Sequence, residues 1–360
     1  MKTTILFLIL LLALSALAGW TRTYGGSSYD YGESVAQTSD GGYIVAGYTY
    51  SFGAGGYDVY LVKTDAVGDT IWTRTYGGFD VDFGYSVAQT SDGGYIVAGE
   101  TYSFGAGGSD VYIVKTDAVG DTLWTRTYGG SDYDYGRSVA QTSDGGYIVA
   151  GYTASFGAGS WDVYLVKTDG LGDTIWTRTY GGSDGDYSNS VAQTSDGGYI
   201  AAGYTSSFGA GYNDVYLVKT DAVGDTIWTR TYGGGNTDKG YSVAQTSDGG
   251  YIVAGYTRSF GAGEDDVYLV KTDSLGYTGI EENPPAKPEA FAISAYPNPF
   301  NGNCRLMIDD LGMGIDAIEI YDVNGRMVEE LPRLASLGTP SLAKGNSPLK
   351  RYRAEKQGEN

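Results

Sequence analysis

Three features of the sequence predict an all-β fold built from five repeated sheets of four antiparallel strands. The segment WTRTYGG recurs every 52 residues, and the segments SVAQTSDGGYI and DVY with VKTD follow each copy at constant spacing. The composition, with 58 glycines, 34 tyrosines and 41% hydrophobic residues, is typical of many short strands joined by tight turns. Four strands in about 50 residues, with no helical apolar spacing, predict a blade of a β-propeller. The sequence therefore predicts a five-bladed β-propeller, with repeats at Trp20, Trp72, Trp124, Trp176 and Trp228.

The first repeat resolves into four strands, which we expect at residues 34–38, 43–49, 59–64 and 70–76. The turn Ser39-Asp40-Gly41-Gly42 contains an Asp-Gly pair, which adopts the positive φ of a tight hairpin. The turn Asp65-Ala66-Val67-Gly68 fits a type I turn closed by a left-handed glycine. The second and third strands are apolar on both faces, so we expect neighbouring sheets to cover both sides of each blade.

The two ends of the repeat array predict how the ring closes. Residues 20–24 (WTRTY) stand in the position of a fourth strand before the first repeat, whereas the last repeat has no such segment after Gly276. We therefore expect residues 20–24 to complete the fifth blade, since closure removes exposed sheet edges. An open solenoid is the alternative, but it would need distinct capping repeats. The predicted propeller spans residues 19–280.

Residues 1–18 have the features of a secretory signal peptide. Lys2 supplies the positive charge, residues 5–14 form an apolar run, and Ala16-Leu17-Ala18 fits a cleavage site. A membrane anchor is the alternative, but this run is too short to span a bilayer. We therefore expect a mature chain that is secreted or lies on the outer cell surface.

The repeat resembles those of bacterial secreted β-propellers, which carry GG…D…G, then DGGYIVAGYT, then a D-x-x-G-x-x-x-W hairpin. The resemblance covers roughly residues 20–280. The D-x-x-G-x-x-x-W element is also similar to the tryptophan-docking element of quinoprotein propellers and to the Asp box of sialidase-type propellers. In these families the element holds adjacent blades together, so the resemblance implies a fold and no chemistry.

The sequence changes character after residue 280. Residues 281–292 form a Pro-rich acidic linker. In residues 293–331, YPNPFNGNCRLMI and IEIYDVNGRMVEEL resemble the first half of the type A sorting domain of the type IX secretion system. The resemblance implies a partial immunoglobulin-like β-sandwich and export machinery as a partner. We expect a hairpin of residues 317–322 and 326–331 around Val323-Asn324-Gly325.

The tail, residues 332–360, lacks the glycine-rich final strand pair that such sorting domains carry. We expect it to be disordered, as the end of a truncated or frameshifted gene. If the shortened sorting segment does not function, the sequence predicts a periplasmic location instead.

The composition excludes several classes of function. The chain has 43 acidic against 23 basic residues, a net charge of −20, which repels nucleic acid and anionic membranes. It has no histidine, and its one cysteine, Cys304, cannot form an intramolecular disulfide or a thiolate cluster. We expect no cofactor and no metal. Carboxylates that recur in every repeat either bind Ca²⁺ or tie loops, and their repetition favours ties; they are Asp30, Asp82, Asp134, Asp186 and Asp238.

Catalysis by paired carboxylates needs two acids in unlike environments, which near-identical repeats rarely provide. Acids that occur in a single repeat include Glu33, Glu100 and Glu264, and we expect each of these three to be a solvated loop residue. We therefore predict that the chain is not an enzyme, with a polysaccharide-acting hydrolase as the alternative.

The repeats differ almost only in the loops between the second and third strands and between one repeat and the next. In an up-and-down blade these loops lie on one face, and aromatic side chains are frequent in them. We predict a non-catalytic binding or adhesion module that recognises a glycan or a protein at the cell surface through this face. Loop drift on a structural spacer is the alternative. The candidate residues are Tyr29, Tyr31, Tyr57, Phe79, Phe83, Tyr85, Tyr133, Tyr135, Trp161, Tyr187 and Tyr212.

Overall fold

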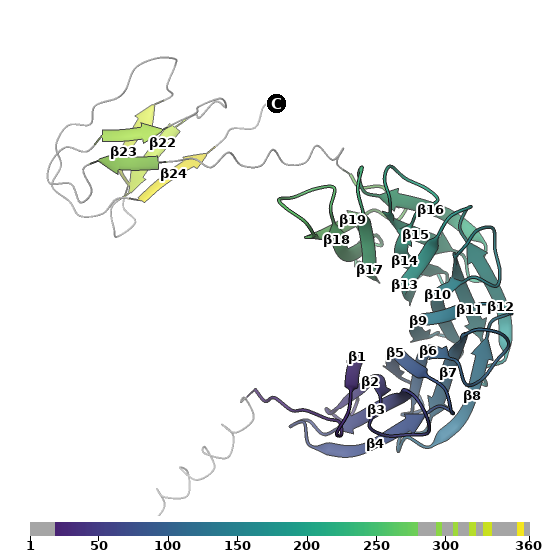
Figure 1. Ribbon diagram of the computed structural model, residues 1–360. Coiled ribbons are helices and arrows are strands. Elements are labelled where there is room, and N and C mark those ends of the chain that lie inside the picture. Colours follow the sequence, from purple (N-terminus) through teal and green to yellow (C-terminus); the bar gives the residue numbers. More distant parts are fainter. Residues whose placement is uncertain are drawn as a thin grey trace, which may run out of the picture. The chain divides into compact units, whose positions relative to one another are not determined.

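The computed structural model describes residues 19–279 completely and, beyond them, the backbone of five short strands (Figure 1). The chain divides into two units, Met1–Gly279 and Ile280–Asn360. The signal peptide and the linker predicted above lie outside the described residues, so both stay predictions.

The first unit contains five consecutive antiparallel sheets, as the repeats predict, and in each sheet the strands follow chain order. The first sheet consists of β1 (Asp30–Gln37), β2 (Tyr43–Thr49), β3 (Asp58–Thr64) and β4 (Thr70–Tyr76). The second consists of β5 (Asp82–Gln89), β6 (Tyr95–Thr101), β7 (Asp110–Thr116) and β8 (Thr122–Tyr128). The third consists of β9 (Asp134–Gln141), β10 (Tyr147–Thr153), β11 (Asp162–Thr168) and β12 (Thr174–Tyr180). The fourth consists of β13 (Asp186–Gln193), β14 (Tyr199–Thr205), β15 (Asp214–Thr220) and β16 (Thr226–Tyr232), and the fifth of β17 (Asp238–Gln245), β18 (Tyr251–Thr257) and β19 (Asp266–Thr272).

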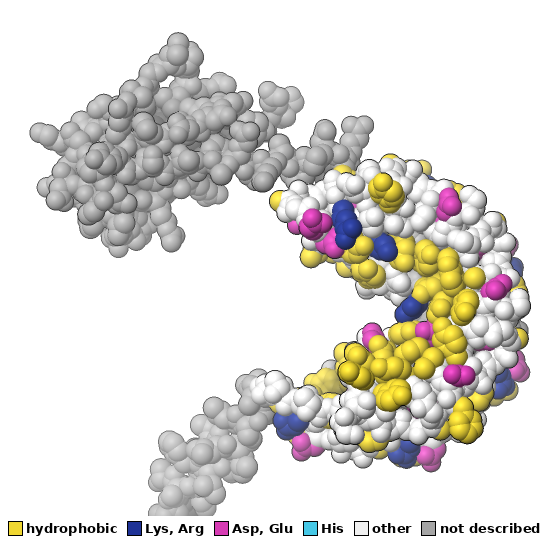
Figure 2. All heavy atoms as spheres, viewed as in Figure 1, with side chains coloured by type: hydrophobic (Ala, Val, Ile, Leu, Met, Phe, Trp, Pro, Cys, Tyr) yellow, Lys and Arg dark blue, Asp and Glu magenta, His cyan; other side chains and the backbone are white. Residues whose placement is uncertain are grey.

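The sheets follow one another around an arc, like blades of a propeller (Figure 1). Each first strand contacts the first strand of the next sheet, from β1 and β5 to β13 and β17. The first strands therefore line the inner side of the arc, and hydrophobic side chains gather on that side (Figure 2).

The first strand of each sheet is longer than the sequence predicts, because it continues through a β-bulge. In the first sheet the pairing shifts between Gly32 and Ser34, which leaves Glu33 unpaired and extends the ladder back to Asp30. Gly47 on the opposite strand allows this, since a Cβ there would overlap the Tyr31 carbonyl oxygen. The other three strands begin within one residue of their predicted positions.

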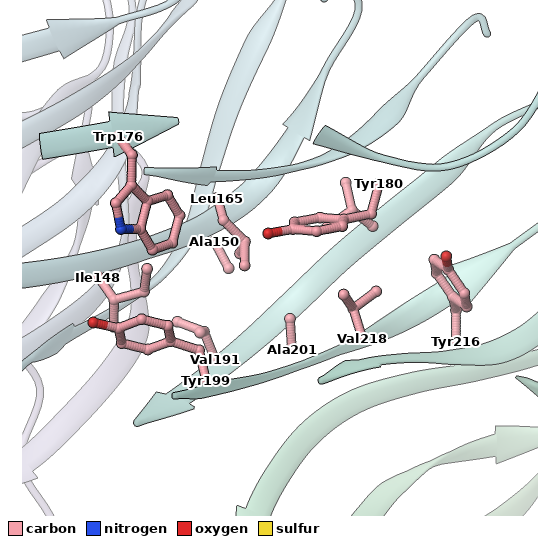
Figure 3. Packing of buried hydrophobic residues seen from close by; sticks show 11 residues of the cluster. Ile148, Ala150, Leu165, Trp176, Tyr180, Val191, Tyr199, Ala201, Tyr216 and Val218 are labelled. Atoms are coloured by element: carbon pink, nitrogen blue, oxygen red, sulfur yellow. The ribbon is translucent and has the colours of Figure 1, made fainter. Parts of the chain in front are cut away.

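Apolar side chains from two adjacent sheets form the core between them, as the two-sided apolar strands predict. Between the third and fourth sheets, Ala150 on β10 and Leu165 on β11 pack in one cluster with Val191 and Tyr199 of the next sheet (Figure 3). The same positions form the clusters between the first and second, second and third, and fourth and fifth sheets. The hydrophobic core of the first unit therefore consists of four equivalent interfaces between adjacent sheets.

The repeated WTRTY segment fastens each sheet to the next, which is the structural role that the resemblance implies. The ring of Trp72 on β4 lies edge-on to Tyr95 with centroids 5.7 Å apart. The Tyr76 hydroxyl donates a 2.7 Å hydrogen bond to the Gly120 carbonyl in the last turn of the second sheet. Arg74 stacks over Trp72 at 5.7 Å.

The predicted closure of the ring is not seen: residues 20–24 form no strand, and the fifth sheet ends at β19. The outward residue Val267 of β19 is 84% exposed, whereas its equivalent Val215 in the fourth sheet is 1% exposed. The described fold is thus five propeller-like sheets with two uncovered ends.

In the second unit, β20 (Ile293–Tyr296) pairs with β21 (Arg305–Ile308), and β22 (Ala317–Tyr321) pairs with both β23 (Met327–Pro332) and β24 (Arg351–Glu355). The pairing of β22 with β23 confirms the predicted hairpin. The tail was expected to hold no strand, but β24 lies in it. The alternating sequence RYRAE suits a strand, and the register places Arg353 opposite Glu319.

Candidate functional site

Most of the variable positions meet at one end of the first and second strands, on the inner side of the arc. The register sets residue 31 opposite residue 48, and both lie beside the loops that precede β1 and β3. Aromatic rings from the first four sheets form two groups there, which Arg137 links and which together we call the aromatic belt. It consists of Tyr31, Tyr48, Tyr57, Phe83, Tyr85, Tyr135, Tyr152, Trp161, Tyr187 and Tyr204.

The first half of the belt spans the first and second sheets. The ring of Tyr48 lies 4.8 Å from that of Tyr31 and 5.4 Å from that of Tyr57. It also meets the edge of Phe83 at 4.7 Å, which joins the two sheets. Phe83 in turn stacks on Tyr85 with centroids 6.1 Å apart. These contacts are within the range of favourable ring pairs.

The second half of the belt repeats this pattern in the third and fourth sheets. The ring of Tyr152 lies 4.9 Å from Tyr135 and 5.4 Å from Trp161. Tyr152 meets Tyr187 at 4.9 Å across the sheet interface, and Tyr187 stacks on Tyr204 at 4.6 Å. Trp161 thus takes the place that Tyr57 holds in the first repeat.

A buried polar cluster joins the two halves. Tyr85 and Arg137 are the unpaired bulge residues of β5 and β9, so the bulge directs them toward the neighbouring strand. The Tyr85 hydroxyl donates a 2.6 Å hydrogen bond to Glu100 Oε1, and Arg137 donates one of 2.6 Å to the Tyr152 hydroxyl. The Arg137 guanidinium also lies 4.1 Å from the Tyr85 ring centre.

Glu100 is the one belt position at which a carboxyl replaces tyrosine. It is 4% exposed on β6, and not the solvated loop residue that the sequence analysis predicts. Burial raises the pKa of Glu100 to about 7, although the hydrogen bond from Tyr85 and the charge of Arg137 oppose the shift. The prediction was wrong because a single sequence does not show that the next sheet covers this position.

The fifth sheet ends the belt with charged groups. Lys239 replaces the aromatic residue of the first strand, and its Nζ lies 3.9 Å from the centre of the Tyr204 ring. Arg258 donates hydrogen bonds to the carboxylate of Asp265, at 2.5 and 3.4 Å. The belt therefore carries aromatic rings across four sheets, with Glu100 and Arg137 at its centre, and ends in charged groups at the fifth sheet.

Of the eleven predicted residues, seven lie in the belt and four do not. Tyr29, Phe79, Tyr133 and Tyr212 lie in exposed loops, with Phe79 92% and Tyr212 76% exposed. Tyr133 contacts Tyr102 at 6.4 Å, and neither Phe79 nor Tyr212 makes a ring contact within residues 19–279. The second-strand tyrosines were not among the predicted residues, although hairpin pairing sets them opposite residue 31 and its equivalents. They are Tyr48, Tyr152 and Tyr204.

The repeated aspartates tie loops, as expected. Asp82 accepts hydrogen bonds of 2.8 Å from the Gly78 amide and from the Ser103 hydroxyl. Asp134, Asp186 and Asp238 hold the equivalent loops in the same way. Among residues 19–279 and the described strands beyond them, no three His, Cys, Asp or Glu side chains gather as a metal site would need.

The opposite face carries ion pairs whose lysine side chains are buried in the first four sheets, while their aspartate partners are exposed. Lys115, 3% exposed, lies 2.9 Å from Asp92 in the hairpin turn of the second sheet. The Asp92 carboxylate also accepts hydrogen bonds from Thr90 and the Gly94 amide. Burial alone would raise the pKa of Asp92, but the bonds from Thr90 and Lys115 lower it to about 2. The carboxylates of Asp92 and its equivalents therefore stabilise the hairpin turns.

Comparisons with known proteins give distant likenesses. No family model matches the chain. The regulatory protein FlaEY of Caulobacter vibrioides is 31% identical over 154 residues, which are 36% of this chain but only 16% of that protein. Two solved structures are similar at 12% identity. Sqt1 from Chaetomium thermophilum has a TM-score of 0.39 over 84% of this chain and 72% of its own, and the Neurospora crassa Pan2 WD40 domain has 0.40 over 76% and 85%.

These likenesses are too distant to bear on function. The assignment of a propeller-like fold is based on the five antiparallel sheets and their strand order. In the part of the chain that the structure describes, no helix is long and apolar enough to cross a membrane.

Proposed function

We propose that this chain is a non-catalytic binding module and that it holds a carbohydrate chain along the aromatic belt. The observation that carries the proposal is the continuity of the belt. Its rings contact one another between the first and second sheets and between the third and fourth, and the Arg137 guanidinium links the two groups by lying over both Tyr85 and Tyr135. Most of these rings stand at positions where the repeats differ. Partly exposed, rigid rings offer flat apolar faces at low entropic cost, which suits stacking on sugar rings.

The charge of the chain narrows the class of carbohydrate. A net charge of −20 repels acidic polysaccharides, so neutral sugars are favoured. Tyrosine hydroxyls in the belt and the amide of Asn189, which donates a 2.8 Å hydrogen bond to the Gly240 carbonyl, provide polar groups beside the rings. A protein partner is the second candidate, favoured by the exposed loop rings of Phe79 and Tyr212.

Catalysis is not part of this proposal. A glycosidase needs two carboxyls whose environments separate their pKa values. Within residues 19–279, burial, Tyr85 and Arg137 govern the pKa of Glu100, and no second carboxyl is among its causes. The other acids that occur in a single repeat, Glu33, Glu264 and Asp265, are exposed.

We also propose that the module works outside the cytoplasm. The proposal rests on the signal-peptide features of residues 1–18 and on the sorting-domain motifs after residue 293. A glycan or protein ligand at the cell surface would then be within reach.

The experiment is a binding screen of the full chain against immobilised neutral polysaccharides, acidic polysaccharides and a panel of surface proteins. The proposal expects saturable binding to at least one neutral polysaccharide and none to the acidic ones. Binding to a protein with no carbohydrate bound would establish the second candidate, and release of sugar fragments would overturn the non-catalytic assignment.

A further inference from the structure

We infer that the aromatic belt contains two separate, equivalent sites for a short neutral oligosaccharide, one on each of two ring clusters. The inference rests on the proposed function, and it adds how many sites there are and which residues form each. The first ring cluster consists of Tyr31, Tyr48, Tyr57 and Phe83. The second ring cluster consists of Tyr135, Tyr152, Trp161 and Tyr187.

The two ring clusters have nearly the same geometry. The central ring of each is the tyrosine of the second strand. Tyr48 lies 4.7, 4.8 and 5.4 Å from the other three rings of the first cluster. Tyr152 lies 4.9, 4.9 and 5.4 Å from the other three rings of the second. Each residue of the second cluster follows its equivalent in the first by two repeats, so the same arrangement is built twice, on alternate sheets.

The repeats beside the two clusters lack the residues that complete a cluster. A complete cluster needs rings at three positions of one repeat and at the first-strand position of the next. In the second repeat, Glu100 and Ser109 replace the central tyrosine and the loop ring. In the fourth, Asn213 replaces the loop ring and Lys239 the ring of the next sheet. Independent drift would mix aromatic and polar residues in every repeat, whereas here four rings occur together twice.

The rings of both clusters can reach a ligand. Every one of them is at least partly exposed, and Tyr31 is 44% exposed. Hydrophobic side chains gather on this inner side of the arc (Figure 2). Because the rings hold one another in place, little side-chain freedom remains to be lost when a sugar stacks on them. Each cluster is therefore a preorganised apolar surface.

Residues of opposite charge lie beside the two clusters. The unpaired bulge residue is Glu33 in the first sheet and Arg137 in the third. Arg137 donates a 2.6 Å hydrogen bond to the Tyr152 hydroxyl. Burial raises the pKa of Tyr48 and the charge of Glu33 adds to the shift, so Glu33 lies beside the equivalent ring. An acidic sugar would be repelled at the first cluster and a basic one at the second, so a ligand that binds equally at both is neutral.

A polar cluster separates the two sites. Tyr85 contacts the first ring cluster at Phe83, and Arg137 contacts the second at Tyr135. Between them Glu100 is 4% exposed, so it offers no surface on which a sugar could stack. A single continuous site is the alternative, in which one sugar chain covers the whole belt. Two sites predict instead that each cluster binds a short oligosaccharide by itself, and that a longer chain able to reach both gains affinity.

The test is a calorimetric titration of the full chain with short neutral probes. The probes are cellotetraose, mannotetraose and a tetrasaccharide prepared from the neutral polysaccharide that binds in the screen. We expect at least one probe to bind with two molecules per chain. Tyr57→Ala and Trp161→Ala each remove one ring from one cluster, so each should bind one molecule, whereas the double variant should bind none.

The control is Phe79→Ala, which removes a 92% exposed ring outside both clusters and should bind two molecules, as the wild type does. Where an alanine variant does not fold, Tyr57→Leu and Trp161→Leu remove the ring and keep an apolar side chain.

The possible failures are distinct. One molecule per chain in the wild type, or loss of all binding in either single variant, would overturn the two sites and leave the proposed function standing. Binding of the polysaccharide without binding of its own tetrasaccharide would do the same, because it requires a site longer than one cluster. If neither the probes nor any neutral polysaccharide binds, the inference and the proposed function fail together.

Discussion

The Tyr85 hydroxyl donates a hydrogen bond of 2.6 Å to Glu100, and the same ring lies 4.1 Å from the Arg137 guanidinium. Tyr85 and Glu100 belong to the second sheet and Arg137 to the third, so the contact joins two blades at the middle of the aromatic belt. At the position equivalent to Glu100, the other four repeats carry a tyrosine. The cluster gives an otherwise repetitive surface a polar centre.

The raised pKa of Glu100 predicts that the free energy of unfolding decreases as the pH rises. Because its pKa is about 7 in the folded chain, above the model-peptide range, ionisation opposes folding, and stability falls as pH rises between about 4.5 and 7. Glu100→Gln should therefore raise the unfolding free energy by roughly 2–3 kcal/mol near pH 8 and change it little below about pH 4.5. Denaturant unfolding at the two pH values measures this. The control is the exposed Glu33→Gln, and an equal effect of Glu100→Gln at both pH values would refute the assignment.

The aspartates at the start of the third strands should also lower the stability of the fold as the pH rises. Burial raises the pKa of Asp58 and of Asp110 to about 6; an amide hydrogen bond from Ala54 or Ala106 opposes the shift, and a neighbouring carboxyl adds to it. Since a raised carboxyl pKa removes stability as pH rises from about 4 to 6, we expect Asp110→Asn to flatten the decline in melting temperature over that range. Differential scanning calorimetry in steps of pH measures the decline. A variant whose melting temperature falls as steeply as the wild type would contradict the prediction.

The hairpin-turn ion pairs should matter more than the surface pairs. Lys115 is buried and bound to Asp92 at 2.9 Å, whereas Arg74 and Asp121 are both well exposed at 3.4 Å. Removing Asp92 leaves a buried ammonium without its counter-ion, so Asp92→Asn should lower the melting temperature by roughly 5 °C. Asp121→Asn should lower it by less than about 1–2 °C. Equal losses for the two variants would show that burial of Lys115 does not set the difference.

The sequence alone predicted the strands of the five sheets and their order, because the Asp-Gly turns and two-sided apolar strands are local signals that recur five times. It wrongly predicted a strand at residues 20–24 and none in the tail, where β24 lies. It did not predict the bulge after Gly32, since the extra residue is accommodated by Gly47 on the facing strand, 15 residues away. The burial of Glu100 depends on the same feature, because bulge residues Tyr85 and Arg137 cover it. Local turn chemistry is readable from one sequence, whereas contacts between sheets are not.

The loop-tying aspartates should not respond to calcium. The Asp82 carboxylate is already bonded to the Gly78 amide and the Ser103 hydroxyl. We expect the same melting temperature with millimolar Ca²⁺ and with a chelator, because a ligand that binds only the folded chain would raise it. A saturable rise with Ca²⁺ would return these residues to the role of metal ligands.

The central claim is that the aromatic belt, and no other face, holds the ligand. The most direct measurement is a calorimetric titration of the polysaccharide found in the screen into three proteins: the wild type, a belt variant with Tyr57, Trp161 and Tyr187 changed to alanine, and a control. The control changes Val119, Leu171 and Val223, exposed in the turns of the opposite face, to alanine. We expect the belt variant to lose at least about tenfold in affinity, a change of about 1.4 kcal/mol, while the control binds like the wild type. Undiminished binding by a folded belt variant, or loss of binding in the control, would contradict the account.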